Sequence, residues 1–137
     1  MRVQFALLLW LHSMTLLLYA NEYVVVTKSE LGSVTETQIK AIYLQKLHYL
    51  KEKKLLPINL EADNPIRKSF NKHILHMSYN RLKIYWMKQH YLGHRPPLSL
   101  HSQKSVKAFL NKVDGAIGYV EMKNVDKTMH ILLRWSD

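Results

Sequence analysis

The sequence predicts an α/β sandwich, because short runs of β-branched and other apolar residues alternate along the chain with amphipathic helical stretches. Apolar residues that recur at steps of three or four indicate the helices, and continuous apolar runs bounded by polar residues indicate the strands. No internal repeat or low-complexity linker interrupts residues 21–137. We therefore expect a single domain over residues 21–137.

The domain is expected to begin with a buried strand followed by a helix. Residues 23–27 read Tyr-Val-Val-Val-Thr, a composition typical of a strand. Thr35 and Gln38 have the spacing of a capping box, in which each side chain bonds the backbone of the other residue. A helix is therefore expected to start near Glu36.

A second strand and a second helix are predicted next. Residues 51–54 read as an exposed charged loop, and residues 55–60 follow as a strand candidate. Pro57 favours an edge position or the start of that strand, since proline donates no ladder hydrogen bond. Asn64 followed by Pro65 predicts a helix cap with proline at the first helical position.

The rest of the chain is predicted to hold two helices and two strands. Residues 78–91 have helical periodicity, and Gly93 is expected to end that helix. Residues 106–113 predict another amphipathic helix. Residues 115–120 and 129–133 are expected to be short strands that complete the sheet.

Residues 1–20 have the layout of a secretory signal peptide. Arg2 precedes an apolar stretch over residues 5–18, and Ala20 stands at the expected cleavage point. The alternative is an uncleaved membrane anchor, because the stretch is near the lower length limit for crossing a bilayer. The chain contains no cysteine, which excludes a lipoprotein anchor. We expect export to the periplasm.

The charge balance favours an anionic partner. Twenty Lys and Arg face ten Asp and Glu, giving a net charge of +10, and removal of residues 1–20 would leave +9. Nucleic acid is disfavoured as a partner of an exported protein. A small oxyanion, phosphate above all, and an anionic envelope component remain.

Three blocks of the sequence resemble one family in their order and spacing. Residues 37–46 are similar to a family helix that ends in an I-F-L-G-K pattern. Residues 56–60 lead into residues 64–70, and residues 114–120, Asp-Gly-Ala-Ile-Gly-Tyr-Val, are close to P-G-A-I-G-Y-V. The chain thus resembles short phosphate ABC transporter substrate-binding-like proteins. This resemblance implies a type II periplasmic-binding-protein-like α/β sandwich, reduced to about one lobe, over residues 21–137.

The resemblance also indicates where a ligand would bind. Family members carry S-G-T at a helix start, where hydroxyls and backbone N–H groups hold the oxyanion; the matching positions here are Asn64, Pro65 and Ile66. Neither Pro65 nor Ile66 reproduces the hydroxyls of that motif. Asn64, the positive helix end and Arg67 are the expected anion-binding features. The alternative is that Asn64 only caps its own helix.

Thr27 and Ser29 are further candidates for ligand binding. They follow the first strand, and open α/β sheets place ligand loops at strand ends. The alternative interpretation makes them ordinary turn residues. Tyr43 and Trp86 lie on apolar helical stripes and are expected to pack in the core.

The other polar patterns indicate no metal site, cofactor or enzyme. Gly115 and Gly118 are expected to serve a tight turn and close backbone approach rather than to bind a ligand. Four histidines form two pairs at helical spacing, which without a thiol or clustered carboxylates make an incomplete metal site: His73, His76, His90 and His94. No motif of nucleophilic or metal-dependent catalysis is present.

Two functions follow from these patterns. The first is an exported protein that binds a small oxyanion such as phosphate for ABC-type uptake through a membrane permease. The alternative is a ligand-less interaction module of the cell envelope, which keeps the fold and binds an anionic or membrane-protein partner through its basic surface.

Overall fold

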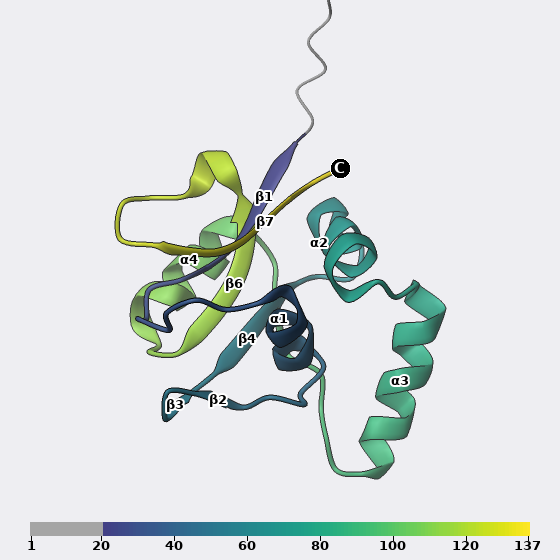
Figure 1. Cartoon of the computed structure of the whole chain (residues 1–137). Coiled ribbons are helices and arrows are strands. Elements are labelled where there is room, and N and C mark those ends of the chain that lie inside the picture. The colour runs from purple at the N-terminus through teal and green to yellow at the C-terminus, as the bar shows by residue number, and fades with distance from the viewer. Residues whose placement is uncertain (1–20) are drawn as a thin grey trace, which may run out of the picture.

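The computed structural model describes residues 21–137, and the expected signal peptide over residues 1–20 lies outside them. The chain forms one five-stranded mixed sheet with helices on both faces, and a separate two-stranded hairpin (Figure 1). The elements in chain order are β1 (Glu22–Thr27), α1 (Glu36–Tyr43), β2 (Tyr49–Leu50), β3 (Lys53–Lys54), β4 (Leu56–Leu60), α2 (Pro65–Phe70), the π-helix η1 (Asn71–Leu75), α3 (Tyr79–Tyr91), β5 (Leu98–Leu100), α4 (Gln103–Lys112), β6 (Ala116–Glu121), the 3₁₀-helix η2 (Met122–Asn124) and β7 (His130–Ser136).

The sheet has the strand order β5-β4-β6-β1-β7. Strand β4 runs parallel to both β5 and β6, whereas β1 runs antiparallel to its two neighbours, β6 and β7. Four strands therefore point in one direction, and β1 alone is reversed. The carboxyl end of β1 consequently lies at the edge of the sheet where the other strands begin.

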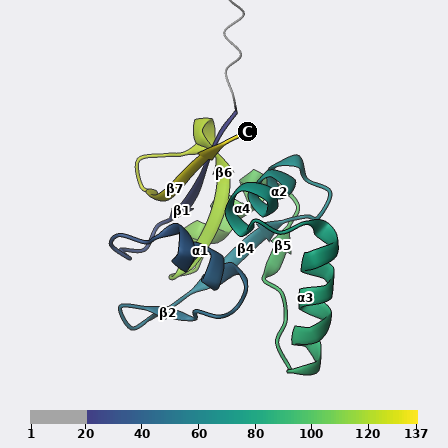
Figure 2. The ribbon, with the colours of Figure 1, turned by 45° about the vertical axis from the view of Figure 1, so that its right-hand side comes forward.

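The hydrophobic core lies on both faces of the sheet. Successive side chains along β6 point to opposite faces, and each face is covered. A Cβ atom on Gly118 would come within 2.6 Å of the Val106 side chain, so α4 packs directly on that face. The next residue, Tyr119, points to the opposite face and stacks on Phe70 at 4.3 Å between ring centroids. Helices α1, α2 and η1 cover this second face (Figures 1 and 2).

Most of the expected elements are present, and their caps explain where they begin. Thr35 and Gln38 form both hydrogen bonds of the capping box at the start of α1. The Asn64 side chain accepts a hydrogen bond from the backbone N–H of Ile66, and Pro65 is the first residue of α2. The expectation that Pro57 marks a strand start is confirmed. The edge position is wrong, because β4 lies between β5 and β6.

Two features differ from the sequence expectation. Residues 51–54 are not a plain loop, since Lys53 and Lys54 pair with Leu50 and Tyr49 in the β2–β3 hairpin. Strand β5 was also not expected, because its three residues carry too little pattern to mark a strand. Glycine serves the tight turn and the close backbone approach that were expected. Gly115 has φ +81°, and a Cβ there would come within 2.0 Å of the Lys54 carbonyl oxygen.

Within residues 21–137, no helix combines the length and the apolar character needed to cross a bilayer.

Candidate functional site

The edge where β4, β5 and β6 end is the natural place for a ligand. Strand β4 connects to β5 through α2 and α3, and β5 connects to β6 through α4 on the other face. Open α/β sheets bind ligands outside the carboxyl ends of the strands, where the chain turns to opposite sides. The Tyr119 hydroxyl fixes this end of β4, since it accepts from the Leu60 N–H at 3.1 Å and donates to Asn59 Oδ1 at 3.0 Å. Burial raises the pKa of the Tyr119 phenol, so it stays protonated and can donate.

Asn64 stands at this edge, where its side chain bonds to its own helix. Its Oδ1 atom accepts the Ile66 N–H at 2.9 Å, as a helix cap does. The acceptor is therefore already used in starting α2. Asn64 also does not line either of the cavities found next to α2.

Arg67 joins α2 to the ends of two strands. Its Nη1 atom donates to the Leu60 carbonyl at 3.0 Å and to Ser99 Oγ at 3.3 Å. The Nε atom is buried and has no hydrogen-bond partner in the described part of the chain. A guanidinium carries five N–H donors, and within residues 21–137 only those on Nη1 make hydrogen bonds. Arg67 thus holds the fold at this edge and keeps unused donors.

Two adjoining cavities lie between α2–η1 and α3, and together we name them the α2–α3 groove. The smaller, about 150 Å³, is lined by Ala62, Arg67, Asn71, Tyr79, Leu82, Lys83 and Trp86. The larger, about 480 Å³, shares three of these residues and is lined by Ala62, Asp63, Lys68, Asn71, Lys72, Met77, Ser78 and Tyr79. The groove therefore combines an apolar wall with several polar side chains.

The charges of the groove are strongly unbalanced. Four cationic side chains line it, and none of them takes part in an ion pair within residues 21–137: Arg67, Lys68, Lys72 and Lys83. Asp63 is the one carboxylate in the lining. The carboxylate of Glu61, just upstream, lies 3.1 Å from His101 Nδ1. Such an arrangement attracts an anion and supplies hydrogen-bond donors to it.

Thr27 and Ser29 lie at the opposite edge of the sheet. Thr27 pairs with Ile117 at the start of β6, because β1 is antiparallel. Its hydroxyl donates to the Ala116 carbonyl at 2.8 Å and accepts the Ser29 N–H at 3.2 Å. The structure therefore does not bring this pair together with Asn64 and Arg67.

The Ser29 hydroxyl is also fully used inside the protein. It donates to Asp114 Oδ1 at 2.7 Å and accepts the Gly115 N–H at 2.8 Å. Lys53 holds the second carboxylate oxygen at 2.6 Å. The bond from Lys53, followed by the bond from Ser29, lowers the pKa of the Asp114 carboxyl. These bonds close the turn before β6 and leave no free hydroxyl for a ligand.

The remaining candidate side chains are two aromatic residues, which pack against the core, and four histidines. Tyr43 is buried, and its hydroxyl lies 3.0 Å from the Ile58 carbonyl and 3.2 Å from that of Ile117. Trp86 packs against the core and also lines the groove. Two of the four histidines singled out above lie beside single carboxylates, and no group of three metal-ligating residues occurs in residues 21–137.

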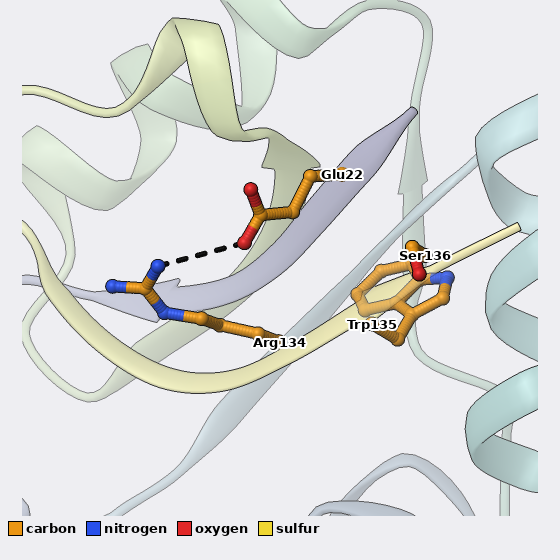
Figure 3. A pocket seen from close by; sticks show the side chains of 4 residues that line it. All are labelled: Glu22, Arg134, Trp135 and Ser136. Atoms are coloured by element: carbon orange, nitrogen blue, oxygen red, sulfur yellow. Dashed lines mark hydrogen bonds and ion pairs between the residues drawn. The ribbon is translucent and has the colours of Figure 1, made fainter. Parts of the chain in front are cut away.

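A shallow pocket at the end of β7 is a weaker candidate. Glu22, Arg134, Trp135 and Ser136 line it (Figure 3). The guanidinium of Arg134 points to the Glu22 carboxylate at 3.5 Å, whereas Trp135 projects to the other side of the strand (Figure 3). The one cation of this pocket already has its counter-ion, so the α2–α3 groove is the better anion site.

The Lys residues of the groove escaped the sequence reasoning. Lys68 and Lys72 are four residues apart and therefore share a helix face, a pattern visible in the sequence. Lys83 is brought to Arg67 by the packing of α3 beside α2, which no local pattern indicates.

The chain has a type II periplasmic-binding-protein-like α/β fold. Solved structures of phosphate-transport binding proteins share it. An ABC-type phosphate transport receptor from Vibrio cholerae matches with a TM-score of 0.64 and 16% identity over 82% of this chain and 45% of that chain. A putative phosphate ABC transporter substrate-binding protein from Clostridium perfringens, solved with bound phosphate, matches with a TM-score of 0.65 and 18% identity over the same shares.

This chain thus spans about 45% of the length of each of these two proteins. The similarity confirms the fold expected from the sequence blocks. Both neighbours are binding proteins of transport systems rather than enzymes. No family profile matches the chain, and no curated protein matches it in sequence.

Proposed function

We propose that this chain is a solute-binding-like protein of the cell envelope that holds a small oxyanion, phosphate first, in the α2–α3 groove for ABC-type uptake. The observation that carries the proposal is the set of four cations around the groove, none of them in an ion pair within the described residues. The fold shared with phosphate-transport binding proteins supports it.

Polar residues of the groove and the neighbouring cap residue Asn64 have distinct roles in this proposal. Arg67 donates from its unused N–H groups, whose planar fork matches two oxygens of a phosphate. Lys68, Lys72 and Lys83 act as point charges, and Asn71, which lines both cavities, adds a neutral donor. Asn64 acts indirectly, because it fixes the first turn of α2 and hence the position of Arg67. No covalent step is involved.

Export and a membrane permease belong to the same proposal. Cleavage after Ala20 would release the domain of residues 21–137 into the periplasm, where a solute-binding protein meets its substrate. A permease would then receive the anion. The open position of the groove at the side of the sheet favours rapid exchange over tight retention.

Calorimetric titration of the full chain tests the binding. Phosphate and sulfate are titrated against a neutral sugar, and we expect heat from the oxyanions at millimolar concentration or below and none from the sugar. Lys83→Gln removes one groove cation and is expected to weaken phosphate binding about tenfold, the worth of one charge-assisted hydrogen bond. Lys88→Gln is the matched control, since Lys88 lies five residues further along α3 and does not line the groove.

Two results would overturn the proposal. One is the absence of binding by any oxyanion at millimolar concentration. The other is an equal loss in Lys83→Gln and Lys88→Gln, because it would mean that phosphate responds to net charge and not to the groove. Arg67→Lys keeps the positive charge but loses the planar set of guanidinium donors. Its phosphate affinity therefore measures how much bidentate hydrogen bonding contributes.

A further inference from the structure

Helix α3 has a second apolar face that points away from the core. Leu82, Tyr85 and Trp86 face the rest of the protein, and the Tyr85 hydroxyl donates to the Leu44 carbonyl at 2.6 Å. The opposite side carries Ile84, Met87 and Tyr91, which are 53%, 54% and 86% exposed. These three residues follow the i, i+3, i+7 spacing of one helical stripe. We call them the outer stripe.

No other part of residues 21–137 covers the outer stripe. Helix α3 stands at the side of the molecule, outside the layers formed by the sheet and the other helices (Figures 1 and 2). Leu92, directly after the helix, and Leu98, on the edge strand β5, are also largely exposed. Aliphatic and aromatic side chains exposed together in this way are characteristic of an interaction surface.

The charge around the outer stripe has a single sign. Residues 78–97 include Arg81, Lys83, Lys88 and Arg95 and contain no Asp or Glu. With about 100° per residue, Lys83 and Lys88 flank the stripe on its two sides, each about 70° from its centre. No ion pair within residues 21–137 includes a residue of α3. The charge of this face is therefore available to a partner.

The apolar outer stripe with its basic flanks favours one kind of partner. A second copy would set one acid-free basic helix against another, which like-charge repulsion disfavours. A protein groove that accepted this helix would have to be acidic to match its cations, and a measurement with soluble polyglutamate separates that partner from a membrane. An apolar stripe with basic side chains on both flanks matches a helix lying in the plane of a membrane, with its lysines reaching up to the headgroups. The Tyr91 ring, apolar with a polar tip, suits the same depth.

We propose that the outer stripe of α3 docks this protein on an anionic phospholipid surface. Ile84, Met87 and Tyr91 enter the boundary between headgroups and acyl chains, and Arg81, Lys83 and Lys88 contact the phosphates. Lys83 borders both the outer stripe and the α2–α3 groove, whereas Arg81 and Lys88 do not line the groove, so membrane docking and oxyanion capture can be lost independently.

The absence of cysteine from the 137-residue chain gives a direct test. Met87→Cys is labelled in the full chain with a fluorophore that brightens in apolar surroundings, and Leu56→Cys, an exposed site on β4, is the matched control. Vesicles of equal parts phosphatidylglycerol and phosphatidylcholine are compared with phosphatidylcholine alone. We expect brightening at position 87 with the anionic vesicles only, and none at position 56. Because each label reports its own site, binding through residues 1–20 does not imitate this result.

Variants separate the apolar and the charged contributions. Arg81→Gln with Lys88→Gln removes two cations from the flank away from the groove and is expected to weaken the vesicle response more than tenfold, at about fivefold per basic residue. Ile84→Ser with Tyr91→Ser is expected to abolish the brightening, with circular dichroism checking the fold.

Four results overturn the proposal. They are no response at position 87, equal responses at positions 87 and 56, an equal response to soluble polyglutamate, which points to an acidic protein partner, and brightening without vesicles that rises with protein concentration, which points to a second copy.

Discussion

Replacing Ser29 by alanine tests whether the hydroxyls after β1 serve the fold or a ligand. The Ser29 hydroxyl accepts the buried Gly115 N–H at 2.8 Å, and no alanine atom can replace this acceptor. A buried N–H without a partner costs about 1–3 kcal/mol. The exposed Asp114 also loses a donor, but Lys53 still holds its carboxylate at 2.6 Å. We therefore expect Ser29→Ala to lower the free energy of unfolding by about 2 kcal/mol.

Thermal unfolding followed by circular dichroism measures this loss. For a domain of this size, about 4 °C of Tm corresponds to 1 kcal/mol, so Tm should fall by about 8 °C. Ser33→Ala is the control, because Ser33 is exposed in the same loop and makes no side-chain hydrogen bond within the described residues. Phosphate affinity should not change in either variant. An unchanged Tm together with lost phosphate binding would refute the reasoning and return Ser29 to the ligand site.

Two further predictions concern pH and the β2–β3 hairpin. Burial raises the pKa of the Tyr43 and Tyr119 phenols above the ordinary value of 10.0. The unfolded chain loses these protons near pH 10 while the folded protein keeps them, so stability should be full below about pH 10 and fall as the pH rises above it. Denaturant titrations at increasing pH check this, and phenolate absorbance from all eight tyrosines before any loss of structure would contradict it. In the hairpin, Lys51 and Glu52 have φ of 47° and 64°, which a type I′ turn requires and Asn-Gly adopts readily. Replacing Lys51 and Glu52 by Asn-Gly should raise the free energy of unfolding by about 1 kcal/mol, which is measured as a rise in Tm. A lowered Tm would show that the Lys51 and Glu52 side chains stabilise the hairpin in another way.

Helix starts could be predicted from the sequence because their causes are local. The Thr35 capping box and the Asn64-Pro65 cap each depend on residues within three positions, and both form as expected. Strand β5 could not be predicted, because Leu98–Leu100 becomes a strand only by pairing with β4, nearly forty residues earlier in the chain. The β2–β3 hairpin was missed for a different reason: a turn of Lys51 and Glu52 lacks the Asn or Gly that such turns favour.

The candidate site was predictable only in part. Arg67 was found because it follows a helix cap, which is a local signal. Lys83 could not be found, since it reaches the groove only through the packing of α3 beside α2. Thr27 was chosen because it ends a strand, but the direction of that strand depends on its neighbours in the sheet. The reversed direction of β1 places Thr27 at the edge away from Arg67.

The direction of β1 also explains why the two edges of the sheet differ chemically. At the edge of Thr27 and Ser29, every hydroxyl is saturated by the turn that leads into β6, and the carboxylate of Asp114 is held by Lys53. At the opposite edge, Arg67 makes hydrogen bonds only through Nη1, and the lysines around it have no counter-ion within residues 21–137. Polar residues are common to both edges, so their presence alone does not distinguish a binding site from a closed turn. The buried Nε donor of Arg67, which the fold of residues 21–137 leaves without a partner, does distinguish them, because a buried polar group without a hydrogen bond costs free energy that a bound anion would recover.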